Sequence, residues 1–126
     1  MEKWKRWRYI LGMSALDSRT RSTAAAFRRH LEERYGPRLR AVYVYGSRAR
    51  GDHRPDSDLD AAVVLDRVDD YWREVDGVFD AAYRTFMEPD GILVHALPFP
   101  EDALRDPDRH QDGHLAKAVL REGVRV

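Results

Sequence analysis

Residues 45–51 read YGSRARG and residues 57–60 read SDLD, and the organisation of the chain follows from these two segments. Gly46 comes directly after LRAVYVY at residues 39–45, a run of β-branched and aromatic residues that predicts a buried strand. A glycine in this place lets the backbone turn sharply and approach a ligand, and the amides that follow it can converge on an anion. We therefore expect Gly46 and Ser47 to hold a phosphate.

Asp58 and Asp60 begin a second predicted strand, DLDAAVVL at residues 58–65. Side chains two residues apart on a strand project from the same face, so the two carboxylates repel each other. At about 6–7 Å and an effective dielectric constant of about 20, this repulsion is on the order of 2–3 kcal/mol. A bound cation turns it into attraction, and carboxylate oxygens suit Mg²⁺. Taken alone, two acids at a strand start are more often a solvated strand end.

The segments on either side of these motifs are predicted to form further helices and strands. Apolar residues at helical spacing from residue 16 to residue 36 predict a helix, begun by Asp17 or Ser18 and ended by Gly36 and Pro37. The remaining predicted elements are a helix over 70–87, a strand over 92–99, a loop over 101–112 and a helix over 113–122. The order α-β-β-α-β-α predicts an α/β (α+β) domain with a small mixed sheet flanked by helices.

The predicted helix over 70–87 is rich in aromatic residues. They recur with a period near 3.6, so we expect them in the core, with any surplus aromatic surface available to a partner; they are Tyr71, Trp72, Phe79, Tyr83 and Phe86.

Composition limits the classes of protein to consider. The 126 residues favour one domain, and 43% hydrophobic content supports a core although charged residues reach 35%. The absence of cysteine excludes disulfides and thiolate zinc sites, and no apolar run has the length of a membrane span, so we expect a soluble, cytoplasmic protein. The net charge of zero conceals a basic segment over 1–40 and an acidic one over 41–126, a split that suits a charged protein partner or reflects solvated helices.

The spacing G-S-x(10)-D-x-D, with a predicted strand on either side, resembles the nucleotidyltransferase superfamily of the DNA polymerase β type. More closely, GSRARG and SDLD look like the minimal nucleotidyltransferases, the MNT antitoxins encoded beside HEPN toxins. The resemblance covers residues 17–126, and the tail REGV at 121–124 is similar to endings in that group. Residues 1–16 form a basic and aromatic extension of unassigned role.

The resemblance implies roles for individual residues. Gly46 and Ser47 would hold the β- and γ-phosphates of ATP, while Asp58 and Asp60 would hold Mg²⁺. Two further candidates are Arg48 and Arg50. Either guanidinium can neutralise phosphate charge, and Arg50 can equally pair with an aspartate to hold the loop.

One position departs from the family pattern. Active relatives carry a third carboxylate on the next long strand, whereas residues 92–97 here read ILVHAL. His95 occupies the corresponding place, where a neutral imidazole can act as a base or a ligand, or can simply form a hydrogen bond. Asp90, before the strand, is a weaker substitute for the missing acid.

The resemblance implies an antitoxin that binds a HEPN-type toxin and transfers AMP from ATP to a hydroxyl of the toxin, on a tyrosine. One alternative is a catalytically degenerate domain that neutralises its partner by binding alone, which the missing acid favours. Another is a transferase acting on a small molecule such as an aminoglycoside, although 126 residues leave little chain for an acceptor pocket. The net charge of zero argues against a nucleic-acid substrate.

Overall fold

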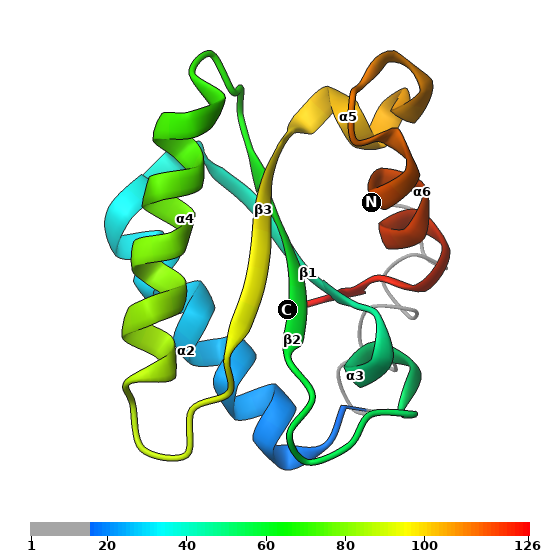
Figure 1. The fold of residues 1–126 in the computed structure, drawn as a ribbon. Helices are drawn as coiled ribbons and strands as arrows, with labels where there is room; N and C mark the ends of the chain where they lie inside the picture. Colours follow the sequence, from blue (N-terminus) through cyan, green and yellow to red (C-terminus); the bar gives the residue numbers. More distant parts are fainter. Residues whose placement is uncertain (1–15) are drawn as a thin grey trace.

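A four-stranded mixed sheet forms the centre of the computed structural model, which describes residues 16–126 (Figure 1). The strand order is β3-β2-β1-β4. β1 (Leu39–Tyr45) runs antiparallel to β2 (Leu59–Leu65) and to β4 (Val124–Arg125), while β2 and β3 (Val94–Pro100) are parallel. The basic and aromatic extension predicted at the start of the chain lies, apart from Leu16, outside the described residues.

Helices lie on both faces of the sheet. α2 (Ser18–Tyr35) and α4 (Tyr71–Phe86) cover one face, and α5 (Glu101–Arg105) and α6 (Gly113–Glu122) lie against the other (Figure 1). Successive strand residues alternate between the faces, so each face has its own apolar cluster. The larger cluster lies under α2 and α4, and the smaller one under α5 and α6. None of the helices within residues 16–126 is long and apolar enough to span a membrane.

Both long helices form where the sequence predicts them, because each begins at an aspartate cap. The Asp17 carboxylate accepts a hydrogen bond from the Thr20 amide at 2.7 Å, and Asp70 does the same for Arg73 at 3.2 Å. Gly36 ends α2 with φ of +52°, a conformation that glycine adopts without strain. The predicted α-β-β-α-β-α order is confirmed for the main elements.

Three short features differ from the sequence prediction. Residues 101–112, predicted as a loop, contain α5 and the 3-10 helix Pro107–Arg109. α5 forms because two acids occupy its first turn and Ala103 is buried beneath it. The third strand begins at residue 94 instead of 92, and the two-residue strand β4 is too short to leave a sequence pattern.

The prediction that the aromatic residues of α4 belong to the core is wrong for most of them. Trp72 is 73% exposed and Phe79 is 68% exposed, and Tyr83 and Phe86 are also exposed. The core side of α4 is instead made of smaller residues, Gly77, Val78, Ala81 and Ala82. The exposed aromatic residues and the small buried residues both recur at helical spacing, because α4 carries one apolar stripe toward the sheet and a second one toward solvent. The spacing alone therefore could not tell them apart.

Candidate active site

Three strands bring Tyr45, Asp60 and His95 into one row across the sheet. Tyr45 is the register partner of Asp60 on β1, and His95 is its partner on β3. Register partners point to the same face, which is the face carrying α5 and α6. His95 Nδ1 lies 3.5 Å from Asp60 Oδ1, so the imidazole and the carboxylate are within ion-pairing reach when the histidine is protonated.

The turn after β1 comes into close contact with Asp60. Gly46 has φ of +74° and ψ of −154°, and a Cβ atom built on it would lie 2.5 Å from Asp60 Oδ2. Only glycine therefore fits between the end of β1 and this carboxylate. The one-turn helix α3 (Ser47–Arg50) begins directly after it. The glycine-serine turn and the second aspartate, far apart in the sequence, thus form one place on the surface.

Negative charge is concentrated at this place. Burial raises the pKa of Asp60, and the nearby Asp58 carboxylate raises it further, while His95 and Arg50 act in the opposite direction. Burial, with Asp60 as the leading charge, also raises the pKa of Tyr45 to about 12. Asp58 itself is exposed just before β2. The local field therefore favours a cation.

The donor set can be compared with what Mg²⁺ requires. Within residues 16–126 no group of three or more histidine, aspartate or glutamate side chains is arranged to hold a metal ion. Mg²⁺ needs no such cage, because it commonly binds through one or two carboxylates together with substrate phosphates and water. Asp58 and Asp60 fit that second arrangement, with hard oxygen ligands next to a turn suited to phosphate.

Arg48 does not face the turn. Its side chain is 2% exposed, and its guanidinium donates to Thr20 Oγ1 at 2.9 Å and to three loop carbonyls. These carbonyls belong to Ser57, Arg54 and Pro55. The expected phosphate contact is therefore replaced by a structural one, in which Arg48 ties the loop over residues 52–57 to α2. A buried guanidinium needs such partners, which explains why the loop wraps around it.

Arg50 is held by two carboxylates. It donates to Asp52 Oδ2 at 3.2 Å and to both carboxylate oxygens of Glu122 at 3.1 and 3.2 Å. Glu122 Oε1 also accepts the Gly46 amide at 3.2 Å. The sequence left open whether Arg50 neutralises phosphate charge or pairs with an aspartate to hold the loop. This geometry agrees with the second interpretation. Glu122, at the end of α6, is a site residue that sequence reasoning missed, and the resemblance of the tail was its only signal.

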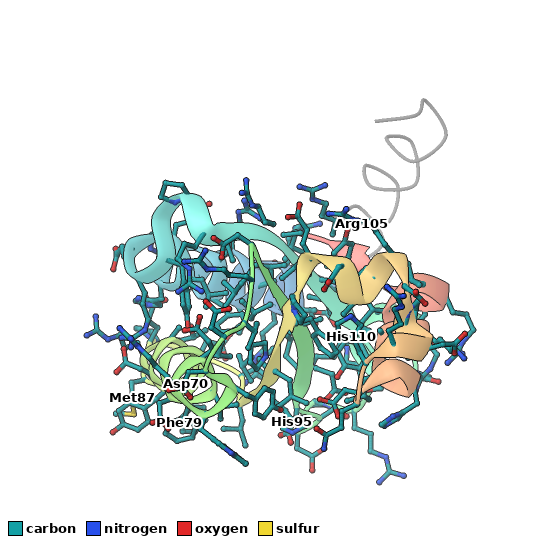
Figure 2. The ribbon with its side chains drawn as sticks, turned by 90° about the horizontal axis from the view of Figure 1, so that it is seen from above. Asp70, Phe79, Met87, His95, Arg105 and His110 are labelled. Carbon is teal, nitrogen blue, oxygen red and sulfur yellow. The ribbon has the colours of Figure 1, made fainter. Side chains whose placement is uncertain are left out.

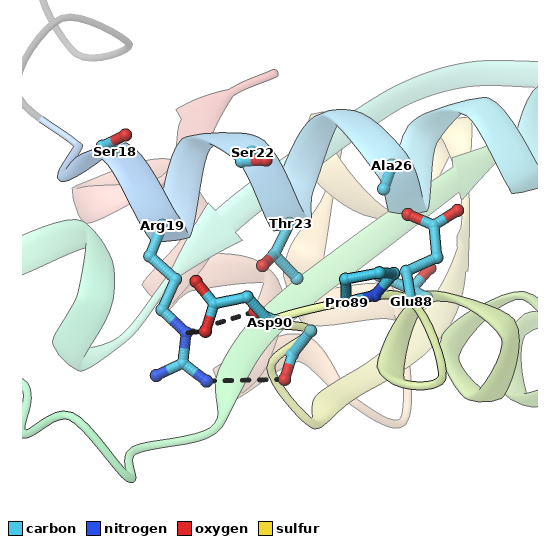
Figure 3. Close-up of a pocket in the computed structure, with 10 residues that line it drawn as sticks. Ser18, Arg19, Ser22, Thr23, Ala26, Glu88, Pro89 and Asp90 are labelled. Atoms are coloured by element: carbon cyan, nitrogen blue, oxygen red, sulfur yellow. Dashed lines mark hydrogen bonds and ion pairs between the residues drawn. The ribbon is translucent and has the colours of Figure 1, made fainter.

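A concavity lies between α2 and the segment after α4 and has a volume of about 290 Å³ (Figure 3). Arg19 crosses it and donates to the backbone carbonyl of Asp90 at 3.2 Å and to that of Gly91 at 3.5 Å. The Asp90 carboxylate is 3.3 Å from Arg19 Nε. Asp90 is thus engaged here, and His95 is the residue that lies beside Asp60.

Comparison with known proteins bears on this arrangement. Residues 25–117 match the model of the family described as the nucleotidyltransferase domain. The chain belongs to this family. The matched segment of the nucleotidyltransferase domain runs from within α2 to within α6, so it contains the glycine-serine turn, both aspartates and His95.

A solved structure is also similar to this nucleotidyltransferase domain. It is a protein from Sulfolobus solfataricus described as a "putative nucleotidyltransferase", with 23% sequence identity and a TM-score of 0.47. The match covers 78% of this chain and 86% of the other. No curated protein matches the chain closely enough to count as a relative.

Proposed function

We propose that this nucleotidyltransferase domain is an MNT-type antitoxin, which uses Mg²⁺ to transfer AMP from ATP to a tyrosine hydroxyl of a HEPN-type toxin. One observation carries the proposal: the Gly46 turn is packed directly against Asp60, with the exposed Asp58 two residues before it in the chain and His95 alongside. This arrangement supports the proposal, because a turn suited to phosphate, two carboxylates suited to Mg²⁺ and an imidazole are what the reaction requires.

The nucleotide side of the reaction follows from the turn and the two acids. The amides after Gly46 would face the triphosphate, and Asp58 and Asp60 would hold the magnesium ion. When bound, Mg²⁺ neutralises phosphate charge and makes pyrophosphate a better leaving group. Because Glu122 and Asp52 already balance Arg50, the charge neutralisation at the turn is assigned mainly to the ion and not to this arginine.

His95 supplies the proton acceptor in this proposal. Its Nδ1 faces Asp60 Oδ1, so the neutral ring carries its proton on Nδ1 and leaves the Nε2 lone pair free for a second proton. The acceptor oxygen attacks the α-phosphorus, its proton passes to Nε2, and the bond to pyrophosphate breaks. Asp60 stabilises the imidazolium that forms, as a carboxylate partner does for other catalytic histidines.

An acceptor on another protein suits the openness of the site. Asp58 is exposed and the His95 side chain is 64% exposed, so a large acceptor has access to both. The 290 Å³ concavity beside α2 is lined by none of the proposed catalytic residues, which gives no support to a small-molecule acceptor such as an aminoglycoside. Inhibition of the partner by binding alone is the second candidate, and the histidine in place of a third acid favours it.

The test is label transfer from α-labelled ATP, in the presence of Mg²⁺, to the HEPN-type toxin of the proposed pair. We expect label on the partner with the wild type, and none with Asp58→Asn/Asp60→Asn. Asp56→Asn, an exposed acid in the same loop, is the matched control and should transfer normally. Absence of label with the wild type, together with unchanged neutralisation by the double variant, would favour binding alone.

A further inference from the structure

The solvent-facing side of α4 carries a row of exposed apolar side chains, which we call the aromatic face. It consists of residues that are each 45–73% exposed, namely Trp72, Phe79, Tyr83, Phe86 and Met87, with Leu93 just before β3. With about 150–250 Å² for each whole aromatic side chain, the face exposes on the order of 700 Å². The largest apolar patch on a typical monomer is about 300–600 Å², and a standard interface buries about 800 Å² per partner. The aromatic face is therefore large enough to be an interface.

Four charged residues border the aromatic face on one side. Arg73, Asp76, Asp80 and Arg84 follow one another at spacings of three, four and four residues, which places them in one row along the helix. Arg84 Nε pairs with Asp80 Oδ2 at 3.2 Å. Within residues 16–126, no ion pair engages Arg73 or Asp76. Read along α4, the border carries the charges plus, minus, minus, plus.

This order disfavours a second copy of the chain as the occupant. In a symmetric antiparallel pair of α4 helices the two borders meet along the same side, whereas in a symmetric parallel pair each border faces the partner's opposite flank, which carries no charged residue. Because the charge order is the same from either end, the antiparallel arrangement centred on Phe79 brings like charges to the same level, and the parallel one leaves both borders without complementary charges. Like charges across an interface weaken it and exclude the wrong partner. The complementary border is minus, plus, plus, minus, which this helix does not have.

We propose that the aromatic face docks an amphipathic helix of a different protein, one with an apolar stripe bordered by acidic residues at its ends and basic residues at its centre. Phe79, Met87 and His95 project toward the same side of the molecule (Figure 2). Although α4 and the candidate active site lie on opposite faces of the sheet, β3 is the edge strand between them, so a protein bound on α4 can reach around this edge to His95. That this protein is the acceptor rests on the proposed function; the docking itself does not.

Two synthetic helical peptides with identical leucine stripes test the proposal, with borders Glu-Lys-Lys-Glu and Lys-Glu-Glu-Lys at the spacing found on α4. Calorimetric titration into the full chain should show the first peptide binding at least about tenfold more tightly. Phe79→Asp should abolish binding. Leu120→Asp, at an exposed leucine on α6, is the matched control and should leave binding unchanged. Equal binding of the two peptides, or none, would overturn the proposal.

A charge-reversed variant distinguishes loss of docking from loss of folding, because only a folded protein can switch its preference to the second peptide. The variant Arg73→Glu/Asp76→Lys/Asp80→Lys/Arg84→Glu should prefer the second peptide, and an unchanged preference would contradict the role of the border. Sedimentation velocity should show a monomer; a dimer that Phe79→Asp dissociates would assign the face to a second copy. Asp58→Asn/Asp60→Asn should bind the first peptide normally. A protein that binds the peptide but transfers no label would therefore count against the proposed function and not against the docking face.

Discussion

Asp60 and His95 face each other from neighbouring parallel strands, with Asp60 Oδ1 3.5 Å from His95 Nδ1. His95 thus occupies the place on β3 where the resemblance to active relatives implies a third carboxylate. A carboxylate there would repel Asp58 and Asp60, whereas an imidazole can form a hydrogen bond with Asp60 and still accept a proton. In the proposed reaction, this exchange makes the imidazole the group that takes the acceptor's proton, and it leaves Asp58 and Asp60 as the carboxylates proposed to hold the metal ion.

The role of His95 leads to a kinetic prediction. His95→Gln should lower the rate of AMP transfer by about 10²–10⁴-fold, the usual contribution of a general base, because glutamine cannot accept the proton. His95→Asp should transfer faster than His95→Gln, since it supplies a carboxylate in the same place. Single-turnover label transfer measures both rates. If His95→Gln reacts as fast as the wild type, the imidazole is only a hydrogen-bonding neighbour of Asp60.

The contact between Gly46 and Asp60 predicts a substitution effect. Gly46→Ala forces a methyl group against the Asp60 carboxylate at a positive φ, so we expect it to lose about 1–3 kcal/mol of stability and most Mg²⁺-dependent ATP binding. Gly51→Ala is the matched control. Gly51 also has a positive φ, of +85°, but nothing lies within 4 Å of its added Cβ. It should cost about 1 kcal/mol and leave ATP binding intact. Urea unfolding and calorimetric titration measure the two effects.

We expect Arg48 to stabilise the fold through the hydrogen bonds of its guanidinium and not through its positive charge alone. Arg48→Lys keeps the positive charge but cannot reproduce the hydrogen bonds from Nε and both Nη atoms. We expect a loss of about 2–3 kcal/mol in the free energy of unfolding, measured in urea. Arg50→Lys, at the exposed arginine two residues later, should leave the free energy of unfolding nearly unchanged. Equal effects of the two substitutions would contradict the difference in role.

How far the sequence predicts this molecule depends on the distance over which each feature is encoded. The bounds of α2, β1 and α4 follow from local signals, such as the caps at Asp17 and Asp70 and the glycine at residue 36. The pairing of Asp60 with His95 needs the register of β2 and β3, which only the family resemblance suggested. Burial was not predictable in the same way. Nothing local distinguishes the buried Arg48 from the exposed Arg50, because the difference depends on where the loop folds back.

Glu122 and the aromatic face of α4 are two further features that local sequence patterns could not predict. Glu122 is 76 residues from Gly46 in the sequence, so its hydrogen bond to the Gly46 amide depends on how α6 crosses the sheet. The prediction that the aromatic residues of α4 are buried was wrong for another reason. A period of 3.6 identifies an apolar stripe on a helix but does not say whether the stripe points to the core or to solvent. A second apolar stripe on one helix indicates an interface only after the core side has been identified.

The cap of α2 predicts a pH dependence of stability. The hydrogen bond from the Thr20 amide lowers the pKa of Asp17 below its ordinary value of 3.8, so the carboxylate stabilises the fold fully above the ordinary pKa, and this stability is lost as the pH falls through the lowered pKa of the folded state. Asp17→Ala should lose about 1 kcal/mol near neutral pH. The difference from the wild type should shrink between about pH 5 and about pH 3. Asp17→Asn keeps an acceptor at the cap and is the control. A difference between wild type and Asp17→Ala that stays constant over this range would refute the titration of Asp17.

The most direct test of the proposed metal site is equilibrium binding of ATP with and without Mg²⁺. It is measured by calorimetric titration of the wild type, Asp58→Asn, Asp60→Asn and the control Asp56→Asn. We expect Mg²⁺ to strengthen ATP binding to the wild type and to Asp56→Asn by about tenfold or more, and we expect Asp58→Asn and Asp60→Asn each to lose this gain. ATP binding that is independent of Mg²⁺, or that is equal in all four proteins, would contradict the assignment of Asp58 and Asp60 as the metal site of a nucleotidyl transfer reaction.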